Sequence, residues 1–400
     1  MTPLAIALIV LVAMFLLGLP IFMSLIISSV VAILAGGDIL PLSVIHNSLF
    51  DDLNLCPLLA IPCFVVAGTL MEFGNITQQI VDVVKQLVGR VYGGLGITTI
   101  LACTFFAAIS GSGPGTVAAV GTILVPAMVR NGYSKDYASA AASSGGTIGI
   151  LIPPSIMLVS MGSYANVSVG KIFFDAIVPG LVLSLFYMIY VFVICHIHPD
   201  YGPAMSAEEL AAMPLGERIT GSLVNLIPPV ILIVGVLGSI FTGWATPTEA
   251  AGVGALFSLI LAIFYKQFSF KMLYDSLIDT AKTSAMVFII LFGASAFTGI
   301  FMSLDGDQLI ATWISSVGIG KWGAFAIMMA IVFVMGMFLD WLGIVMIVFP
   351  IFLPIMDMFG FDRLWIVAVT AVMLQSKSTI TFFMNSVPIS VGCTSKANSL

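Results

Sequence analysis

The spacing of the charged residues constrains this chain more than any other feature. Charged residues make up 8% of the 400 residues, against about 25% in an ordinary soluble domain. No Asp, Glu, Lys or Arg occurs in four long stretches, at residues 1–37, 53–71, 91–129 and 137–170. A helix needs about 20 mainly apolar residues to cross a bilayer core. The sequence therefore predicts an all-α polytopic membrane protein. It excludes a soluble enzyme, a nucleic-acid-binding protein and a transmembrane β-barrel, whose strands would alternate apolar and polar residues.

The apolar stretches give a coarse map of the chain. Amphipathic stretches at 75–92 and 305–321 are typical of interfacial helices. A polar connecting loop at 199–220 divides the chain into residues 1–198 and 221–400. We expect crossing or re-entrant helices at 4–36, 53–73, 95–128, 137–165, 172–197, 221–241, 247–265, 283–303, 322–356 and 364–390.

The two parts resemble each other and have opposite charge patterns. The segment from Pro126 to Tyr133 matches that from Pro354 to Phe361, 228 residues later. Cytoplasmic loops are rich in Lys and Arg. The loop at 38–52 has three Asp and no Lys or Arg, whereas its counterpart at 266–282 has three Lys. We therefore expect the first loop outside the cell and the second inside, which is the pattern of an inverted repeat.

The first candidate site is a glycine-rich segment in the middle of an apolar stretch. Residues 109–116 read ISGSGPGT, and so many glycines beside a proline cannot hold a regular helix. Broken backbone at membrane depth is tolerated only where it is buried in protein or lines a polar cavity. The alternative is a helix-packing face of small residues. We predict the tip of a re-entrant hairpin that binds a small cation through Ser110, Gly111, Ser112 and Thr116.

The second candidate site is the segment 143–155, SSGGTIGILIPPS. A proline pair removes two backbone donors and breaks a helix. The helix ends so formed offer N–H groups to anions and C=O groups to Na⁺. A simple proline kink is the alternative. We predict a flexible break at 145–149 that closes the first hairpin around Na⁺, with Gly145, Gly146, Thr147 and Gly149 as cation ligands and with Pro153, Pro154 and Ser155 as substrate-binding residues.

Asp340 is the only charged residue between Lys321 and Asp357. A carboxylate inside a membrane is costly unless it is paired, so it marks a candidate functional site. The offset of 228 residues places it opposite Ser112. We predict a second cation site at the tip of a second re-entrant hairpin. The alternative is an aspartate that caps a helix.

The sequence Thr-Pro-Thr-Glu at 246–249 precedes an apolar run and predicts a helix start. Thr246 would be the N-cap and Glu249 would complete a capping box. We also include Thr246 and Glu249 among the candidate substrate-binding residues.

Five motifs resemble, in order, the large membrane subunit of tripartite ATP-independent periplasmic (TRAP) transporters, from about residue 4 to residue 374. They are SGSGPGTVAAVGTILVPAMVRNGY, GGTIGILIPPS, NVSVGKIFFDAIVPG, ATPTEAAGVGA and GMFLDWLGIVMIVFPIFLPI. The resemblance implies a fold of the ion-transporter-superfamily elevator type. It also implies Na⁺-coupled import of a small organic acid across the bacterial inner membrane. The implied partners are a small four-helix membrane subunit and a periplasmic substrate-binding protein, and Na⁺ is the coupling ion.

The sequence also allows function classes other than an importer that depends on a binding protein. The chain has no ATP-binding motif of Walker type, so an ion gradient would supply the energy. A passive channel, or a carboxylate symporter without a binding protein, would also suit re-entrant hairpins. An intramembrane hydrolase using Ser112 is disfavoured because no His or Lys base lies in a matching span. We expect a transporter in a lipid bilayer, with no enzymatic activity and no nucleic-acid partner.

The carboxyl end departs from the pattern of the family. The resemblance implies a Thr-Pro-Pro break there and one more span, but residues 374–383 read LQSKSTITFF, with Lys377 opposite Gly149. A lysine at the centre of a span costs about 2.5–3.5 kcal/mol on insertion scales. The alternative is that Lys377 replaces an ion as a tethered cation. We expect altered or truncated last residues, an incomplete second ion site, and poor or no transport by the chain as written.

Overall fold

The computed structural model describes residues 3–36, 46, 50, 56–73, 80–81, 83–85, 91–203, 215–306, 308–309, 312, 320–337 and 339–375. Within these ranges all regular structure is helical, which confirms the predicted all-α class. The elements are α1 (Pro3–Leu16), α2 (Ile21–Gly36), η1 (Cys56–Leu59), α4 (Ala60–Phe73), α6 (Gly94–Ser110), α7 (Gly113–Arg130), α8 (Lys135–Leu151), α9 (Ile156–Tyr164), α10 (Val169–Ile197), η2 (Pro199–Tyr201), α12 (Leu215–Phe241), α13 (Pro247–Phe264), α14 (Phe270–Ser303), α16 (Lys321–Gly336), α17 (Trp341–Met358) and α18 (Arg363–Met373).

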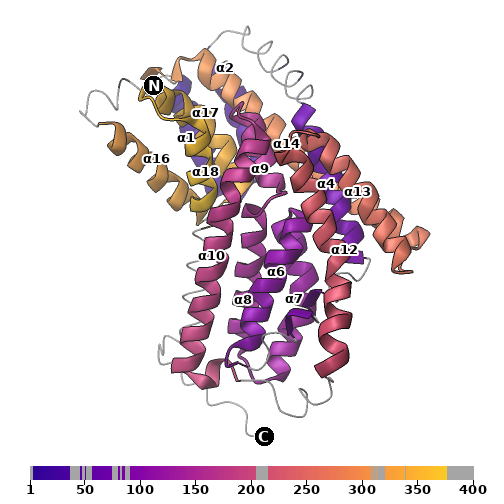
Figure 1. The fold of residues 1–400 in the computed structure, drawn as a ribbon. Helices are drawn as coiled ribbons and strands as arrows, with labels where there is room; N and C mark the ends of the chain where they lie inside the picture. The colour runs from indigo at the N-terminus through magenta and orange to yellow at the C-terminus, as the bar shows by residue number, and fades with distance from the viewer. Residues whose placement is uncertain are drawn as a thin grey trace, which may run out of the picture.

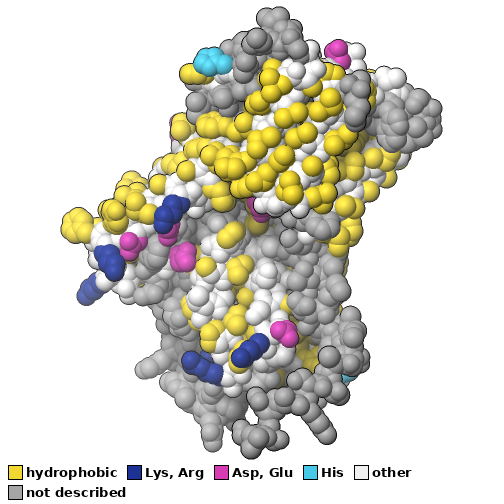
Figure 2. Space-filling view, turned by 180° about the vertical axis from the view of Figure 1, so that it is seen from behind, with side chains coloured by type: hydrophobic (Ala, Val, Ile, Leu, Met, Phe, Trp, Pro, Cys, Tyr) yellow, Lys and Arg dark blue, Asp and Glu magenta, His cyan; other side chains and the backbone are white. Residues whose placement is uncertain are grey.

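The helices are long and apolar enough for a multi-pass membrane protein. Five in the described ranges, α7, α10, α13, α14 and α17, have the length and hydropathy of a membrane span. The consecutive helices α8 and α9 form a further broken span, bent by 42°. Figure 2 shows hydrophobic side chains gathered in a broad patch over the upper half of one face, with charged side chains along its lower margin. Apolar surface of this extent is stable only when lipid or another protein covers it.

The first hairpin is formed by α6 and α7, which lie beside α8 in the lower half of Figure 1. Gly111 ends α6 in the left-handed conformation, at φ 60°. Ser112 is extended and caps α7, and Pro114 follows in the first turn, where a proline costs no hydrogen bond. The helix break therefore lies at Gly111–Ser112, inside the segment where the sequence predicts one.

The second hairpin, α16 and α17, lies in the upper half of Figure 1 and matches the first in its boundaries. Adding 228 to the ends of α7, Gly113 and Arg130, gives 341 and 358, the ends of α17. The N-cap residues of these two helices correspond as well, Ser112 with Asp340.

The helices that follow the two hairpins start at opposite ends of the molecule. Helix α8 begins at Lys135, and the column of α8 and α9 runs upward from the lower end of Figure 1. Arg363 begins α18, and its Nη1 donates to the carbonyl of Ala165, at the far end of the α8–α9 column (3.2 Å). This arrangement is the one that an inverted repeat would produce.

Three sequence predictions differ from the structure or lie beyond it. Helix α12 begins at Leu215, so its first turns occupy the end of the connecting loop predicted at 199–220. The glycines at 145–149 lie inside the regular helix α8, and the break comes after them. The predicted interfacial stretches 75–92 and 305–321 lie largely outside the described residues, as does Lys377.

Cysteine labelling in intact cells tests the inversion. Lys135→Cys and Met358→Cys place exposed thiols beside the first and second hairpins, in a background where the exposed Cys56 is serine. We expect a membrane-impermeant maleimide to label position 358 from outside and position 135 only after permeabilisation. Leu58, which follows the loop 38–52 without Lys or Arg, lines one cavity with Pro354 near position 358, whereas position 135 lies at the end of the first hairpin expected in the cytoplasm. Labelling of both from the same side would contradict the inverted arrangement.

Candidate functional site

The break in the α8–α9 column and the tip of the first hairpin meet each other. The backbone N–H of Ile156 donates to the carbonyl of Gly111 across the two segments (3.2 Å). A Cβ added at Gly111 would lie 2.7 Å from the carbonyl oxygen of Pro154. Only glycine tolerates both the positive φ and this backbone approach. The structure therefore brings together the two segments that the sequence identified. We call this place the junction, comprising residues 110–116 and 149–156.

Four helix ends converge at the junction. Helices α6 and α8 present their carboxyl ends there, whereas α7 and α9 begin there with the serine N-caps Ser112 and Ser155. The Ser112 hydroxyl accepts from the Gly115 N–H (3.3 Å), and the Ser155 hydroxyl accepts from the Leu158 N–H (3.3 Å). Carboxyl ends carry partial negative charge and amino ends partial positive charge. The junction thus offers one set of groups to a cation and another to an anion.

Several oxygen atoms lie close together on the cation-binding side. The hydroxyls of Ser110 and Thr116 are 3.0 Å apart, and the Thr116 hydroxyl donates to the carbonyl of Ser112 (2.7 Å). A Cβ added at Gly149 would lie 3.3 Å from the Thr116 hydroxyl, so α8 runs directly beside these oxygens. Hydroxyl and carbonyl oxygens are ligands of hard cations.

The position of the break changes which α8 residues can contribute a carbonyl. Helix α8 continues to Leu151, so the carbonyls of Gly145, Gly146 and Thr147 face N–H donors one turn later in the same helix. The carbonyl of Gly149 would face residue 153, which is a proline and has no N–H. Among the four predicted ligands on α8, only Gly149 therefore has a backbone carbonyl that lacks its helical N–H donor because of the break.

The other two glycines serve close packing in the structure. A Cβ at Gly146 would overlap Cγ2 of Val117 on α7, and one at Gly145 would lie 2.9 Å from the sulfur of Cys103 on α6. Both helices of the hairpin approach α8 through these positions. The predicted flexible break at 145–149 is therefore wrong. Gly145 and Gly146 lie in a regular helix and let α8 pack tightly against the hairpin.

The proline pair itself is buried and supported by Ser155. Pro153, Pro154 and Ser155 are all buried, and the Ser155 hydroxyl donates to the carbonyl of Ile150. Pro154 has no N–H to offer that carbonyl, so Ser155 replaces the missing donor. The predicted proline break is present, four residues long, at 152–155.

Helix α4 contributes a carboxylate that the sequence analysis did not single out. A Cβ at Gly68 would lie 2.7 Å from the Cα of Ser110, so α4 crosses directly over the hairpin tip. One turn later the carboxylate of the half-buried Glu72 lies 4.0 Å from the position of a Cβ at Gly115. Glu72 thus lies beside the first turn of α7, where a negative charge is favourable. Glu72 follows the apolar stretch 53–71 in the sequence, which is the signal that could have identified it.

The remaining predicted site residues lie elsewhere in the fold. Asp340 occupies the N-cap position of α17 and is exposed, but its side chain makes no capping bond. Thr246 and Glu249 form the predicted capping box at the start of α13, with Thr246 N–H to Glu249 Oε2 at 2.8 Å. Both are exposed, and next to them Thr248 donates to the carbonyl of Cys56 (3.2 Å).

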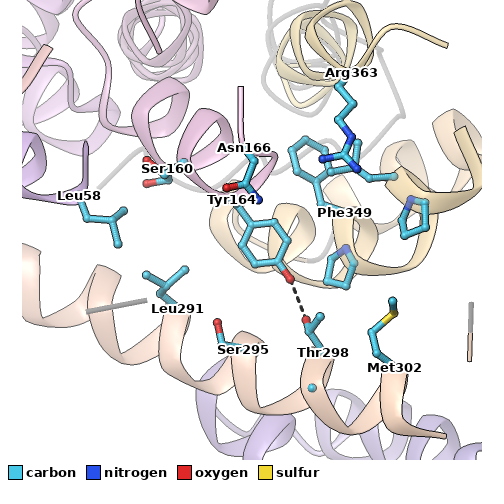
Figure 3. A pocket seen from close by; sticks show the side chains of 15 residues that line it. Leu58, Ser160, Tyr164, Asn166, Leu291, Ser295, Thr298, Met302, Phe349 and Arg363 are labelled. Carbon is cyan, nitrogen blue, oxygen red and sulfur yellow. Dashed lines mark hydrogen bonds between the residues drawn. The ribbon is translucent and has the colours of Figure 1, made fainter. Parts of the chain in front are cut away.

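The structure also contains a cavity of about 440 Å³ that the sequence did not suggest. Figure 3 shows Ser295, Thr298 and Met302 along α14 on one side and Arg363 entering from the opposite side. Tyr164 and Thr298 bridge the two sides through their hydroxyls (2.8 Å). Its lining comes from η1, α9, α14, α17 and the start of α18, segments too far apart in sequence to be recognised as one site.

A family model described as the DctM component of the tripartite ATP-independent periplasmic transporter matches residues 8–381. The chain belongs to this family. It is 35% identical over 318 residues to a C4-dicarboxylate TRAP transporter large permease protein of Pseudomonas aeruginosa, covering 78% of the chain and 72% of the relative.

Two other relatives carry names with different solutes. The chain is 34% identical to an isethionate TRAP transporter permease protein, DctMQ, of Oleidesulfovibrio alaskensis, covering 86% of the chain and 53% of that relative. It is 29% identical to an ectoine TRAP transporter large permease protein of Halomonas elongata, covering 88% of the chain and 81% of that relative. Among solved structures, the YdaH transporter of Alcanivorax borkumensis superposes with a TM-score of 0.60 at 14% identity, covering 85% of the chain and 78% of YdaH. This last likeness concerns the fold.

The junction predicts different outcomes for two glycine substitutions on the same hairpin. Gly111→Ala places a Cβ at positive φ and against the Pro154 carbonyl. We expect it to lower the free energy of unfolding by about 1–2 kcal/mol or more. Gly121→Ala on α7 meets only an ordinary contact with Ala142 at 3.6 Å and should be near neutral. Thermal unfolding of the purified variants in detergent measures both. Equal melting temperatures would contradict the close approach at Gly111.

Proposed function

We propose that the chain is the solute-carrying permease of a three-component importer, driven by Na⁺ and carrying a small organic acid. The observation that carries this proposal is the junction, where two carboxyl ends and two amino ends of helices meet around the break at residues 111–112 and 152–155. Such paired breaks let one place bind a cation and an anion without charged side chains.

Na⁺ fits the oxygen atoms on one side of the junction. The hydroxyls of Ser110 and Thr116 and the released carbonyl of Gly149 supply neutral oxygens. Neutral oxygens suit a monovalent cation, because a divalent ion is held more tightly by carboxylates. Bound Na⁺ would neutralise the partial negative charge of the two carboxyl ends and hold the hairpin tip against α8.

The charged end of the solute would lie at the amino ends of α7 and α9. Ser112 and Ser155 begin these helices, and the proline pair at 153–154 keeps the second one apart from α8. Helix amino ends bind carboxylate and sulfonate groups. The relatives' names include a dicarboxylate, a sulfonate and ectoine, and we assign this chain a small solute of the carboxylate class.

The Ser112 hydroxyl supports transport rather than hydrolysis. It accepts a bond from the Gly115 N–H, which is the contact of a helix cap. A nucleophilic serine would in addition donate to a general base, and no histidine or lysine occurs in the junction segments 110–116 and 149–156. The function we propose is therefore movement of an unchanged solute.

The family description implies the partners and the place of action. We propose that a small membrane subunit covers part of the apolar surface and that a periplasmic binding protein delivers the solute to the outer face. The bacterial inner membrane is the compartment where such a system works. The DctMQ name of one relative, only about half of which the chain covers, is consistent with a separate small subunit here.

We further propose that the second hairpin supplies a second cation site at Asp340 and that the two halves are inverted repeats moving as an elevator. The matching boundaries of α7 and α17 support the repeat. A carboxylate at the start of α17, at the position equivalent to Ser112, would hold a cation by charge rather than by neutral oxygens. We also propose that Thr246 and Glu249, at the start of α13, contact the solute at a place outside the junction.

Ser112 gives a direct test of the ion coupling. Ser112→Ala removes the helix cap, worth about 1 kcal/mol, at the hairpin tip whose Ser110 and Thr116 hydroxyls would bind the ion. We expect Na⁺-driven uptake to fall at least tenfold, while Ser112→Thr, which keeps the hydroxyl, retains most of it. Uptake is measured in proteoliposomes that contain this chain and its small subunit, with a matched binding protein outside.

The same vesicles separate a coupled importer from a passive channel. Accumulation above the outside concentration should require an inward Na⁺ gradient and should stop when choline replaces Na⁺ on both sides. Uptake that continues unchanged in choline would refute Na⁺ coupling. Equilibration without accumulation would show a channel.

A further inference from the structure

The cavity of Figure 3 is separate from the junction. Pro350, in its wall, lies ten residues after Asp340 on α17, a distance of about 15 Å along a helix. Tyr164 lies nine residues after Ser155 on α9, about 13 Å along its axis. The cavity therefore lies roughly three helical turns beyond both helix breaks. It is on the side of the molecule away from Arg130 and Lys135. Leu58 in its wall follows the loop 38–52, which has no Lys or Arg, so we place the cavity on the outer side.

Arg363 gives this cavity a partly used guanidinium. Its Nε and Nη2 bond to both carboxylate oxygens of Asp357, at 2.5–3.0 Å. Its Nη1 donates to the carbonyl of Ala165 (3.2 Å). A guanidinium has five N–H bonds, and these contacts, taken from the described part of the chain, use three. One N–H on each terminal nitrogen therefore remains for a ligand.

Asp357 and Ala165 fix the position of this guanidinium. Asp357 ends α17 and Ala165 ends α9, so the arginine is held by two different helices at the rim of the cavity. An arginine held in this way loses little side-chain freedom when a ligand binds. The ion pair with Asp357 also stabilises the charged guanidinium of Arg363 in the absence of a ligand.

The rest of the wall carries neutral polar groups. Hydroxyls of Ser160, Ser163, Tyr164, Ser295 and Thr298 line the cavity together with the amide of Asn166. Pro350 and Pro354 also line it, and a proline at position 354 leaves the carbonyl of residue 350 without its helical donor. The hydroxyls of Ser160, Ser163 and Thr298 donate to carbonyls of their own helices, so they can only accept from a ligand. The N–H donors for a negative end come from Arg363 and the amide of Asn166.

We propose that this cavity is an outer binding site for a small organic oxyanion, a carboxylate or sulfonate, whose charged end accepts from the remaining N–H groups of Arg363. The identification of the ligand as transported solute rests on the function proposed above. The cavity would hold the solute after it arrives at the outer face and before it reaches the junction. Its volume, about 440 Å³, is ample for a four-carbon diacid.

The test is equilibrium binding of radiolabelled succinate to the full chain, purified in detergent and kept in choline buffer without Na⁺. A Ser112→Ala background weakens the helix cap at the junction, and succinate binding at the cavity should be unchanged by it. We expect saturable binding that unlabelled isethionate displaces and that succinamide, the uncharged analogue, displaces at least tenfold less well.

Two variants address the cavity by different routes. Asp357→Asn with Arg363→Gln removes the guanidinium without leaving an unpaired carboxylate and should weaken succinate binding at least tenfold. Ser163→Leu fills the cavity but keeps Arg363, and it should weaken binding as well. Arg130→Gln, at an exposed arginine on the opposite side, is the matched control and should bind as the parent chain does. Size-exclusion profiles identify any variant that fails to fold, and the Ser163 variant keeps the test decisive if the double variant is lost.

Three outcomes would overturn the proposal: no saturable succinate binding, equal binding by either folded cavity variant, or equal competition by succinamide. These outcomes are distinct from a failure of the proposed function. Na⁺ coupling is read from uptake and depends on Ser112, whereas the outer site is read from binding in choline without a functional junction.

Discussion

The need to satisfy backbone hydrogen bonds away from water governs this fold. A broken helix inside a membrane protein leaves N–H and C=O groups without partners, and each such group costs about 1–3 kcal/mol when it is buried. The junction meets this need by joining two breaks. Gly111 of the hairpin tip accepts from Ile156 of the α8–α9 column, and the Ser155 hydroxyl supplies the donor that Pro154 lacks. Neither break would be stable alone, so the tip and the column must assemble together. The groups that are still released, such as the carbonyl of Gly149, are then available to a ligand.

Close approach of the helices is the second requirement, and small residues supply it. Gly146 has no room for a Cβ beside Val117, and Gly68 brings α4 directly over Ser110. Helix association in membranes depends on such packing, because lipid is as apolar as the side chains. The same small residues that let helices touch therefore also determine how close α4, with Glu72, comes to the hairpin tip. A carboxylate on α4 beside the first turn of α7 favours the arrangement in which these two helices are adjacent.

The sequence predicted the elements of the junction better than its geometry. The break at 111–112, the proline break and the capping box of Thr246 and Glu249 follow from local rules, because proline, glycine and capping residues act on their own backbone. The error at 145–149 arose because glycine has two uses, in flexible backbone and in tight helix packing, and only the facing residues Val117 and Cys103 decide between them. The cavity could not be predicted at all. Its wall combines serines, a tyrosine and an arginine from five segments, and none of them forms a motif in the sequence.

The two hairpins share their boundaries but differ in charge, and this difference has a physical consequence. Ser112 and Asp340 occupy equivalent N-cap positions, yet only the serine makes the capping bond. A serine at a helix start offers a neutral oxygen, so a cation there must be held by several such oxygens together. An aspartate at the same position adds a full negative charge that attracts a cation directly. The amino end of α7 or α17 disfavours a cation at either hairpin, and the carboxyl end of α6 or α16 favours one at either. The charge of Asp340 is therefore the difference between the two places. Two sites of similar geometry would then differ in affinity, and the order in which they fill would follow from that difference.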